Sequence, residues 1–279
     1  MTSQSSGVVN PSITRQGLIE PFDLQVGRGM ITGHQTVQIF GYSTLIGSTA
    51  LGPLWEGLTL SGGTYTYPST AGVVVLLSAS GATDAALQIQ VNGLDANFNL
   101  LTETVTLNGS GTATTSASFL RLNNLYVTNG LNAGNITAKI ATVLYAQINA
   151  GVGQTQMSLY TVPVGYSFYI DYVQANASIG FTSSAYMTYA EYNKFNTTPV
   201  TPVGSVAFGV NGYNPYIAQG SVTLTGQSPF VQIFEVPYTV PLFHPSGTDI
   251  QFLMKASTGS PYVGSIFAGG YLIKNDGAL

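Results

Sequence analysis

The sequence predicts an all-β protein made of two tandem antiparallel β-sandwich domains, the second jelly-roll-like, with an extended N-terminal arm. Apolar and polar residues alternate with a period of two, and no helical apolar stripe exceeds a turn or two. Thr, Val and Tyr, which favour strands, are abundant, and 33 Gly and 13 Pro residues supply turns. We expect the arm at residues 1–48, a β-sandwich at 49–147 and the jelly-roll-like sandwich at 148–279.

The N-terminal segment differs from the rest of the chain. Its charged residues lie among scattered Pro and Gly with little alternation, so it cannot readily bury itself. We expect an arm that lies on a partner, with Ile19, Phe22 and Leu24 burying apolar surface there. The charged residues expected at the rim of that contact are Glu20, Asp23 and Arg28. The alternative is an N-terminal strand that packs on its own domain.

The middle third reads as short strands separated by turn signals. Residues 71–80 form an apolar strand candidate, and in residues 86–93 Leu87, Ile89 and Val91 alternate with polar side chains. Residues 100–107 alternate in the same way. Asn-Gly pairs readily adopt the positive φ of tight hairpins, so we expect strands to end at three such pairs. These are Asn92-Gly93, Asn108-Gly109 and Asn129-Gly130.

The last part repeats this pattern with more aromatic residues. Residues 162–165, with Pro second and Gly fourth, predict a turn between two strands. Further strands are expected at residues 185–192, 230–236, 249–257 and 263–273. A total of about eight strands at this spacing indicates a jelly roll.

Charged side chains are scarce. The chain has 7 Lys and Arg and 11 Asp and Glu, or 6% charged residues, whereas ordinary soluble domains have about 25%. A compact monomer of this size would expose about 11,000 Å². Either this surface is neutral and rich in Thr, Ser, Asn and Gln, or neighbouring molecules cover much of it. We expect an oligomer, because so few charges give a monomer little colloidal stability.

Several partners and compartments are not expected. No apolar run reaches the roughly 20 residues of a membrane-spanning helix, and the first residues lack the basic and apolar regions of a signal peptide. The formal net charge is −4 and no Lys/Arg cluster occurs, so we expect no nucleic-acid partner. The chain has no Cys, which excludes disulfides and thiol chemistry.

No catalytic motif is evident, so we expect neither an enzyme nor a cofactor. His34 and His244 are far apart and are interpreted as turn or surface residues, and the acidic residues are scattered singly. The string Asp95-Ala96-Asn97-Phe98-Asn99 resembles the start of a calcium loop, but Leu100 replaces its turn glycine and Thr106 its bidentate Glu. We therefore expect no metal there, and a polar hairpin loop whose side chains bond their own backbone.

Several strings together resemble a family of virion structural proteins of tailed bacteriophages, especially those of marine bacteria and cyanobacteria. They are QVNGLDANFNLLTETVTLNG, SASFLRLNNLYV, GNITAKI, GQTQMSLYTVPVGYSFYI and PSGTDIQF, and the likeness runs roughly from Pro21 to Ile273. The resemblance implies an all-β protein without catalytic residues, made in the host cytoplasm and carried on the phage particle. It also implies a place on the outer head surface, as a decoration (cement) protein that contacts the major capsid protein or another virion protein. That the expected oligomer is a homotrimer is likewise implied by this resemblance.

Two other functions stay open. One is a tail, neck or fibre component with a receptor- or glycan-binding role, in which Trp55 and the Tyr-rich segments 185–192 and 212–217 form a sugar-stacking face. Core packing is the alternative interpretation of these aromatic residues. The other function is a hydrolase that acts on host surface polymers. Copy number per virion separates the first two, because a head lattice needs far more copies than a tail.

Overall fold

The computed structural model describes residues 14–15, 18–46, 52–57, 65–179, 184–193, 221–223, 230–256 and 262–275. Strands dominate, and the predicted all-β class is confirmed. The helices within these ranges are short: α1 (Phe22–Gly27) and the 3-10 helix η2 (Gly81–Asp84). The 212–217 segment lies outside the described residues.

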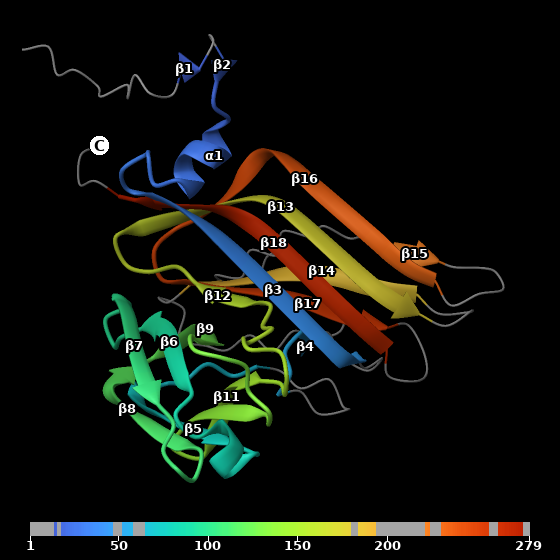
Figure 1. Cartoon of the computed structure of the whole chain (residues 1–279). Coiled ribbons are helices and arrows are strands. Elements are labelled where there is room, and N and C mark those ends of the chain that lie inside the picture. Colours follow the sequence, from blue (N-terminus) through green and yellow to red (C-terminus); the bar gives the residue numbers. More distant parts are fainter. Residues whose placement is uncertain are drawn as a thin grey trace, which may run out of the picture.

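The C-terminal part of the chain forms two antiparallel sheets (Figure 1). One sheet has the order β16 (Phe230–His244), β13 (Tyr166–Ile179), β18 (Tyr262–Lys274), β3 (His34–Ile46). The other has the order β12 (Leu159–Thr161), β17 (Thr248–Ala256), β14 (Ser184–Asn193), β15 (Ser221–Thr223). When β3 is counted as the first of these eight strands and β18 as the last, the sheets read 6-3-8-1 and 2-7-4-5. This is the order of a jelly roll, as predicted.

The first jelly-roll strand comes from the segment expected to be an arm. β3 pairs with β18 from His34↔Ile273 to Tyr262↔Ile46, and Ile39 is buried in the jelly-roll core. The strand is mostly polar or small (HQTVQIFGYSTLI), so its alternation is weak and its place is set by pairing with β18. Here the structure differs from the expected arm, which would have ended at residue 48.

The other sandwich is inserted between the first and second jelly-roll strands, whereas the sequence predicted a tandem arrangement. The chain leaves through β4 (Gly52–Pro53) and returns through β12, and both pair with the same edge of β17. Ser158 joins the two crossings: its hydroxyl donates to Phe252 O at 2.7 Å and accepts from Leu54 N at 2.8 Å. Figure 1 shows the inserted sandwich below β3 and β12.

The inserted sandwich has two antiparallel sheets around a separate core. One has the order β11 (Val143–Ile148), β10 (Ile136–Ile140), β5 (Gly72–Ser78), β8 (Thr112–Phe119). The other has the order β7 (Leu100–Thr106), β6 (Gln88–Leu94), β9 (Arg121–Val127). Ile89 and Val91 point into the core as predicted and are completely buried.

The Asn-Gly pairs behave in two ways. Asn108-Gly109 and Asn129-Gly130 follow strand ends, as predicted. Asn92-Gly93 lies inside β6, where the register with β9 shifts, so the turn predicted there is wrong. A Cβ at position 93 would lie 2.0 Å from the carbonyl oxygen of Arg121, so glycine serves a close backbone approach at this bulge. The chain turns instead at residues 95–99, with Phe98 at a φ of 64°.

Candidate functional site

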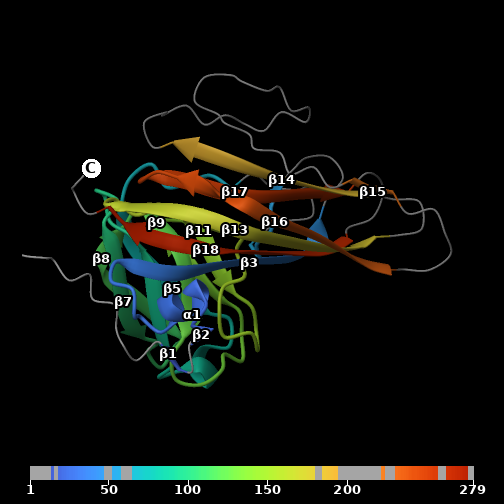
Figure 2. The ribbon, with the colours of Figure 1, turned by 90° about the horizontal axis from the view of Figure 1, so that it is seen from above.

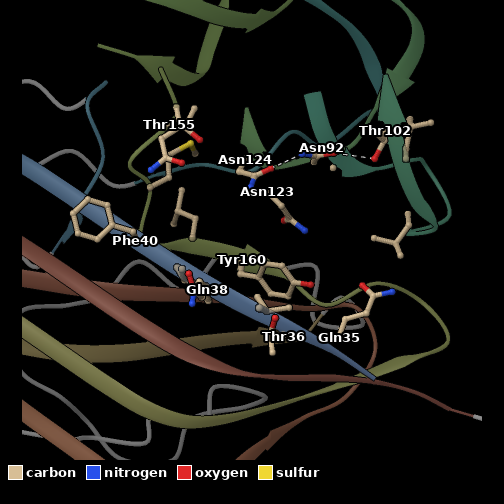
Figure 3. A pocket seen from close by; sticks show the side chains of 18 of the residues that line it. Gln35, Thr36, Gln38, Phe40, Asn92, Thr102, Asn123, Asn124, Thr155 and Tyr160 are labelled. Atoms are coloured by element: carbon tan, nitrogen blue, oxygen red, sulfur yellow. Dashed lines mark hydrogen bonds between the residues drawn. The ribbon is translucent and has the colours of Figure 1, made fainter. Parts of the chain in front are cut away.

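A groove of about 550 Å³ lies at the junction of the two sandwiches (Figure 3). One wall is formed by residues 35–40 of β3, with Tyr160 of β12 beside them. The opposite wall belongs to the sheet β7-β6-β9 of the inserted sandwich. The groove therefore exists only because the insertion returns to the edge of the jelly roll next to β3.

A row of polar side chains crosses the wall formed by β7, β6 and β9. The register places Thr102, Asn92 and Asn124 side by side on these strands. The hydroxyl of Thr102 donates to Asn92 Oδ1 at 2.9 Å, and Asn92 Nδ2 donates to Asn124 Oδ1 at 2.7 Å. These hydrogen bonds hold the amide side chains of Asn92 and Asn124 in a fixed orientation.

Asn123 fixes this wall relative to the jelly roll. Its Nδ2 donates to the carbonyl oxygen of Thr161 at 3.1 Å, and its Oδ1 accepts from Thr161 N at 2.9 Å. Thr161 belongs to β12 of the jelly roll. One amide side chain of the inserted sandwich thus satisfies both backbone hydrogen-bonding groups of a jelly-roll residue. This pair of hydrogen bonds is one of the contacts that tie the two walls of the groove together.

Aromatic and apolar side chains line the rest of the groove. Tyr160 packs on the core residue Phe168, with ring centres 5.2 Å apart, and burial raises the pKa of its phenol. Phe40 and Phe267 also line the groove, and Leu100 is 50% exposed at its edge. Among the described residues that line the groove, none is Lys, Arg, Asp, Glu or His. The groove thus combines amides and hydroxyls with apolar surface and has no formal charge.

A buried ion pair joins the sandwiches beneath the groove. Arg121 of β9 donates two hydrogen bonds to the carboxylate of Asp249 of β17, from Nε to Oδ1 at 2.8 Å and from Nη2 to Oδ2 at 2.9 Å. Its Nη1 donates to the carbonyl oxygen of Pro68 at 3.0 Å. The guanidinium carbon lies 4.6 Å from the ring centre of Tyr67 and 5.2 Å from that of Phe98. This arrangement satisfies two charges that burial would otherwise make costly.

The electrostatics agree with a fixed ion pair. Burial alone would lower the pKa of Arg121, but the hydrogen bonds to the Asp249 carboxylate and the attraction to its charge, together with Tyr67 and Tyr65, outweigh burial and raise the pKa. Burial raises the pKa of Tyr67 well above its ordinary value, so this ring beside the guanidinium stays neutral. Thr161 Oγ1 donates to Asp249 Oδ1 at 2.5 Å, which links the ion pair to the residue that Asn123 holds.

The residues predicted to bind a partner lie at the N-terminal end of the described chain and are not among those that line the groove. β1 (Thr14–Arg15) and β2 (Leu18–Ile19) pair with each other, and the Ile19 side chain is outside the described parts. Phe22 and Leu24 lie on α1 and are 45% and 49% exposed. Figure 2 shows α1 beside β3.

Internal contacts hold α1 against the jelly roll. Val26 is buried, and the Phe22 ring lies edge-on to Tyr271, with centres 5.0 Å apart. Two of the expected rim charges, Glu20 and Arg28, pair with each other at 2.5 Å. Asp23, the third, accepts a hydrogen bond from Tyr271 at 2.5 Å. These charges therefore bond within the chain, while Leu24 stays exposed.

The other candidate residues are scattered. His34 starts β3, with Nδ1 3.1 Å from Thr32 O, whereas His244 ends β16 and is 1% exposed, so it is a core residue and not the expected turn or surface one. Trp55 packs edge-on against Tyr65 and is 7% exposed, so it cannot stack on a sugar. In the described parts of the chain, no three His, Asp or Glu side chains gather as metal ligands. No helix there is long and apolar enough to span a membrane.

Asp95 organises the predicted polar loop. Its Oδ1 accepts from the backbone N of Asn97 at 2.7 Å and of Asn99 at 2.9 Å, and its Oδ2 accepts from Asn99 Nδ2 at 3.0 Å. The predicted loop whose side chains bond their own backbone is confirmed. The loop joins β6 and β7 at one end of the wall that carries the polar row.

Acid is expected to destabilise the inserted sandwich. Burial would raise the pKa of Asp84, but hydrogen bonds from the Ser78 hydroxyl and from the N–H groups of Ala133 and Gly134 outweigh it and lower the pKa. Hydrogen bonds likewise outweigh desolvation and lower the pKa of Asp95 and Glu103. A carboxyl group whose pKa is lowered by folding stabilises the folded protein fully at a pH above its ordinary pKa, which is 3.8 for Asp and 4.5 for Glu. This stabilisation is lost as the pH falls through the folded-state pKa.

Melting curves from pH 7 to pH 3 are therefore expected to show a falling Tm once the pH drops below these ordinary values. The Asp84→Asn variant should have a lower Tm than the wild type at pH 7, and its Tm should fall less steeply as the pH is lowered. Asp23→Asn, far from the inserted sandwich, is the control. An Asp84→Asn variant with the wild-type stability and the wild-type acid profile would contradict the assignment.

Comparisons with known proteins add little. No protein-family model matches the chain, and no curated protein matches it. Solved structures with some similarity include a chain of the T13 viral particle of infectious bursal disease virus (TM-score 0.26, 11% identity, 86% of this chain and 69% of that chain). The VP2 subviral particle of the same virus is another (TM-score 0.26, 11% identity, 87% and 72% covered). At these TM-scores the likeness carries no argument, and the jelly-roll assignment rests on strand order.

Proposed function

We propose that this protein is a structural component of a tailed-bacteriophage particle, a decoration protein that binds the outer head shell and stabilises it. The observation that carries the proposal is the jelly-roll strand order with a second sandwich inserted between its first two strands. Jelly rolls recur in capsid and lectin domains, so this argument is one of fold analogy. The virion-protein strings of the sequence support it independently.

The surface chemistry supports the same role. Contacts that do not depend on ion pairs change little with ionic strength, which suits a particle exposed to variable salt. The inserted sandwich also presents an apolar row on the outer face of β5, where Val73, Val75 and Leu77 are 41%, 38% and 45% exposed. Exposed apolar side chains in a row on an inner strand are typical of a surface that a neighbouring molecule covers.

Quantitative mass spectrometry of purified particles tests the proposal. We expect roughly hundreds of copies, in fixed proportion to the major capsid protein. A few dozen copies or fewer would favour the alternative, a tail, neck or fibre component with receptor- or glycan-binding activity, which the uncharged groove also fits. Particles that lack the protein altogether would overturn both.

The purified protein is expected to be a homotrimer, since the chain has few charges and a closed symmetric assembly would cover apolar surface. Multi-angle light scattering should give the mass of three chains. Val75→Glu places a charge in the apolar row and should shift the mass toward one chain, whereas Thr104→Glu, on the exposed face of β7, should not. A wild-type monomer at tens of micromolar would contradict the prediction.

Leu24→Ser is expected to weaken rebinding to particles stripped of the protein about three- to ten-fold, because burying a whole Leu side chain contributes about 1.5–3 kcal/mol and about half of this one is left to bury. Leu24 is half exposed on α1, so the fold should be unaffected. Co-sedimentation with particles measures binding. The matched control is Leu131→Ser, since Leu131 is 60% exposed in the inserted sandwich. Equal binding by both variants would place the anchor elsewhere.

A further inference from the structure

We propose that the groove between β3 and the sheet β7-β6-β9 is a binding site for a short neutral oligosaccharide. This goes beyond a structural role on the particle and holds at either location on it. The volume of about 550 Å³ lies within the range of about 300–1,000 Å³ that is typical of ligand sites. Its two walls come from different sandwiches, so a ligand would contact both.

The absence of charge in the lining decides the class of ligand. An anionic ligand such as a phosphate ester or uronic acid would need Arg, Lys or a metal, and none of the lining residues supplies one. Nucleic acid needs a basic track, which the described lining residues do not form. A cationic ligand would need a carboxylate, which is also missing from the lining. What fits is a neutral molecule with many hydrogen-bonding groups.

The polar row suits sugar hydroxyls, which donate and accept at one atom. Amide side chains offer two N–H donors and a carbonyl acceptor, and they occur on both walls: Gln35 and Gln38 on β3, and Asn92 and Asn124 opposite. Within the described part of the chain, the Asn124 side chain makes only the bond that it accepts from Asn92. Its two N–H donors are thus available to a ligand at an exposed position.

The apolar part of the lining suits the C–H faces of sugar rings. Tyr160 is seen between the labelled residues of the two walls in Figure 3 and lines the groove. Its ring is held by Phe168, so it offers a fixed surface at little entropic cost. Leu100, at the edge of the groove, extends this surface. A sugar ring has hydroxyl groups around its rim and apolar C–H faces, so it can use both the amide side chains and the apolar side chains of the groove.

The test is ligand-observed saturation-transfer NMR of the full chain with maltohexaose, cellohexaose, laminarihexaose and N-acetylchitohexaose, followed by calorimetric titration of any that bind. An α-1,4-galacturonic acid hexamer is the anionic comparison. We expect at least one neutral hexamer to bind and the anionic one to bind more weakly. Asn124→Ala and Gln38→Ala should each raise Kd about five-fold, the effect of one lost neutral hydrogen bond.

Asn97→Ala and Gln88→Ala are the matched controls, because both residues are exposed on the inserted sandwich and neither lines the groove. Thermal melting confirms that each variant is folded. No saturable binding of any neutral hexamer at about 10 mM, or groove variants that bind as well as wild type, would overturn the proposal. An extended peptide that adds to the edge of β3 would bind through the main chain; binding of such a peptide that both amide variants leave unchanged, without binding of any neutral hexamer, would also overturn the proposal.

Discussion

Replacing Arg121 with Met is expected to lower the free energy of unfolding by about 3–5 kcal/mol, because Asp249 would stay buried without its counter-charge. The side chains of the pair are only 10% and 7% exposed, so water cannot replace the lost hydrogen bonds. Arg121→Lys should also be destabilising, because an ammonium cannot reproduce the two-pronged contact. Urea denaturation followed by circular dichroism measures the loss.

Two controls separate the ion pair from other effects of substitution. Arg28→Met breaks the exposed pair with Glu20 and should change stability by about 0–1 kcal/mol. The double variant Arg121→Met/Asp249→Leu should recover much of the loss, because no charge is then left buried. The fluorescence of Trp55, the single Trp, reports on the core of the inserted sandwich. If Arg121→Met uncouples the two sandwiches, the fluorescence should change at a different urea concentration from the circular dichroism signal. A loss below about 1 kcal/mol would contradict the role assigned to the pair.

The ion pair also has a consequence for the groove. Arg121 lies on β9, two residues before Asn123, and Asp249 accepts a hydrogen bond from Thr161, whose backbone Asn123 binds. Loss of the pair would free one wall of the groove relative to the other. The residues that hold the sandwiches together therefore also hold the candidate ligand site in shape.

The sequence predicted best those elements that local pattern determines. The strict alternation around Ile89 and Val91 fixes β6, and the turn residues Val162–Gly165 separate β12 from β13 as expected. For β3, the alternative of an N-terminal strand on its own domain is the one that the structure bears out; the sequence pattern favours an arm because the residues of β3 are polar or small and only β18 makes them a strand. The nested topology was missed for the same reason, since both sandwiches read as complete and nothing local shows that a strand preceding one of them pairs within the other.

The candidate groove was beyond prediction from the sequence. Its amides come from distant segments and resemble ordinary polar strand residues until the fold places them on facing walls. The ion pair left one signal. In a chain with so few charges, Arg121 stands between Leu120 and Leu122, and Asp249 stands just before Ile250. A charge within an apolar strand pattern indicates a buried partner, although its identity, 128 residues away, needed the structure.

Truncation is expected to separate the particle anchor from the fold. A chain that starts at His34 should keep both sandwiches, because in the described part of the chain it loses only α1 and the two short strands before it. It should bind stripped particles far more weakly than the full chain. A chain that starts at Gly41 should lose the jelly roll, because it removes most of the β3–β18 pairing and the buried Ile39.

Circular dichroism and urea unfolding measure the fold of both truncations, and co-sedimentation measures particle binding. Removing seven residues of the edge strand β3 also exposes the edge of β18, so the Gly41 chain is expected to aggregate as well as to unfold. If it folds as cooperatively as the full chain, β3 is dispensable and the first jelly-roll strand is misassigned. If the His34 chain binds particles as tightly as the full chain, the anchor lies in the sandwiches, and Phe22 and Leu24 have no part in it.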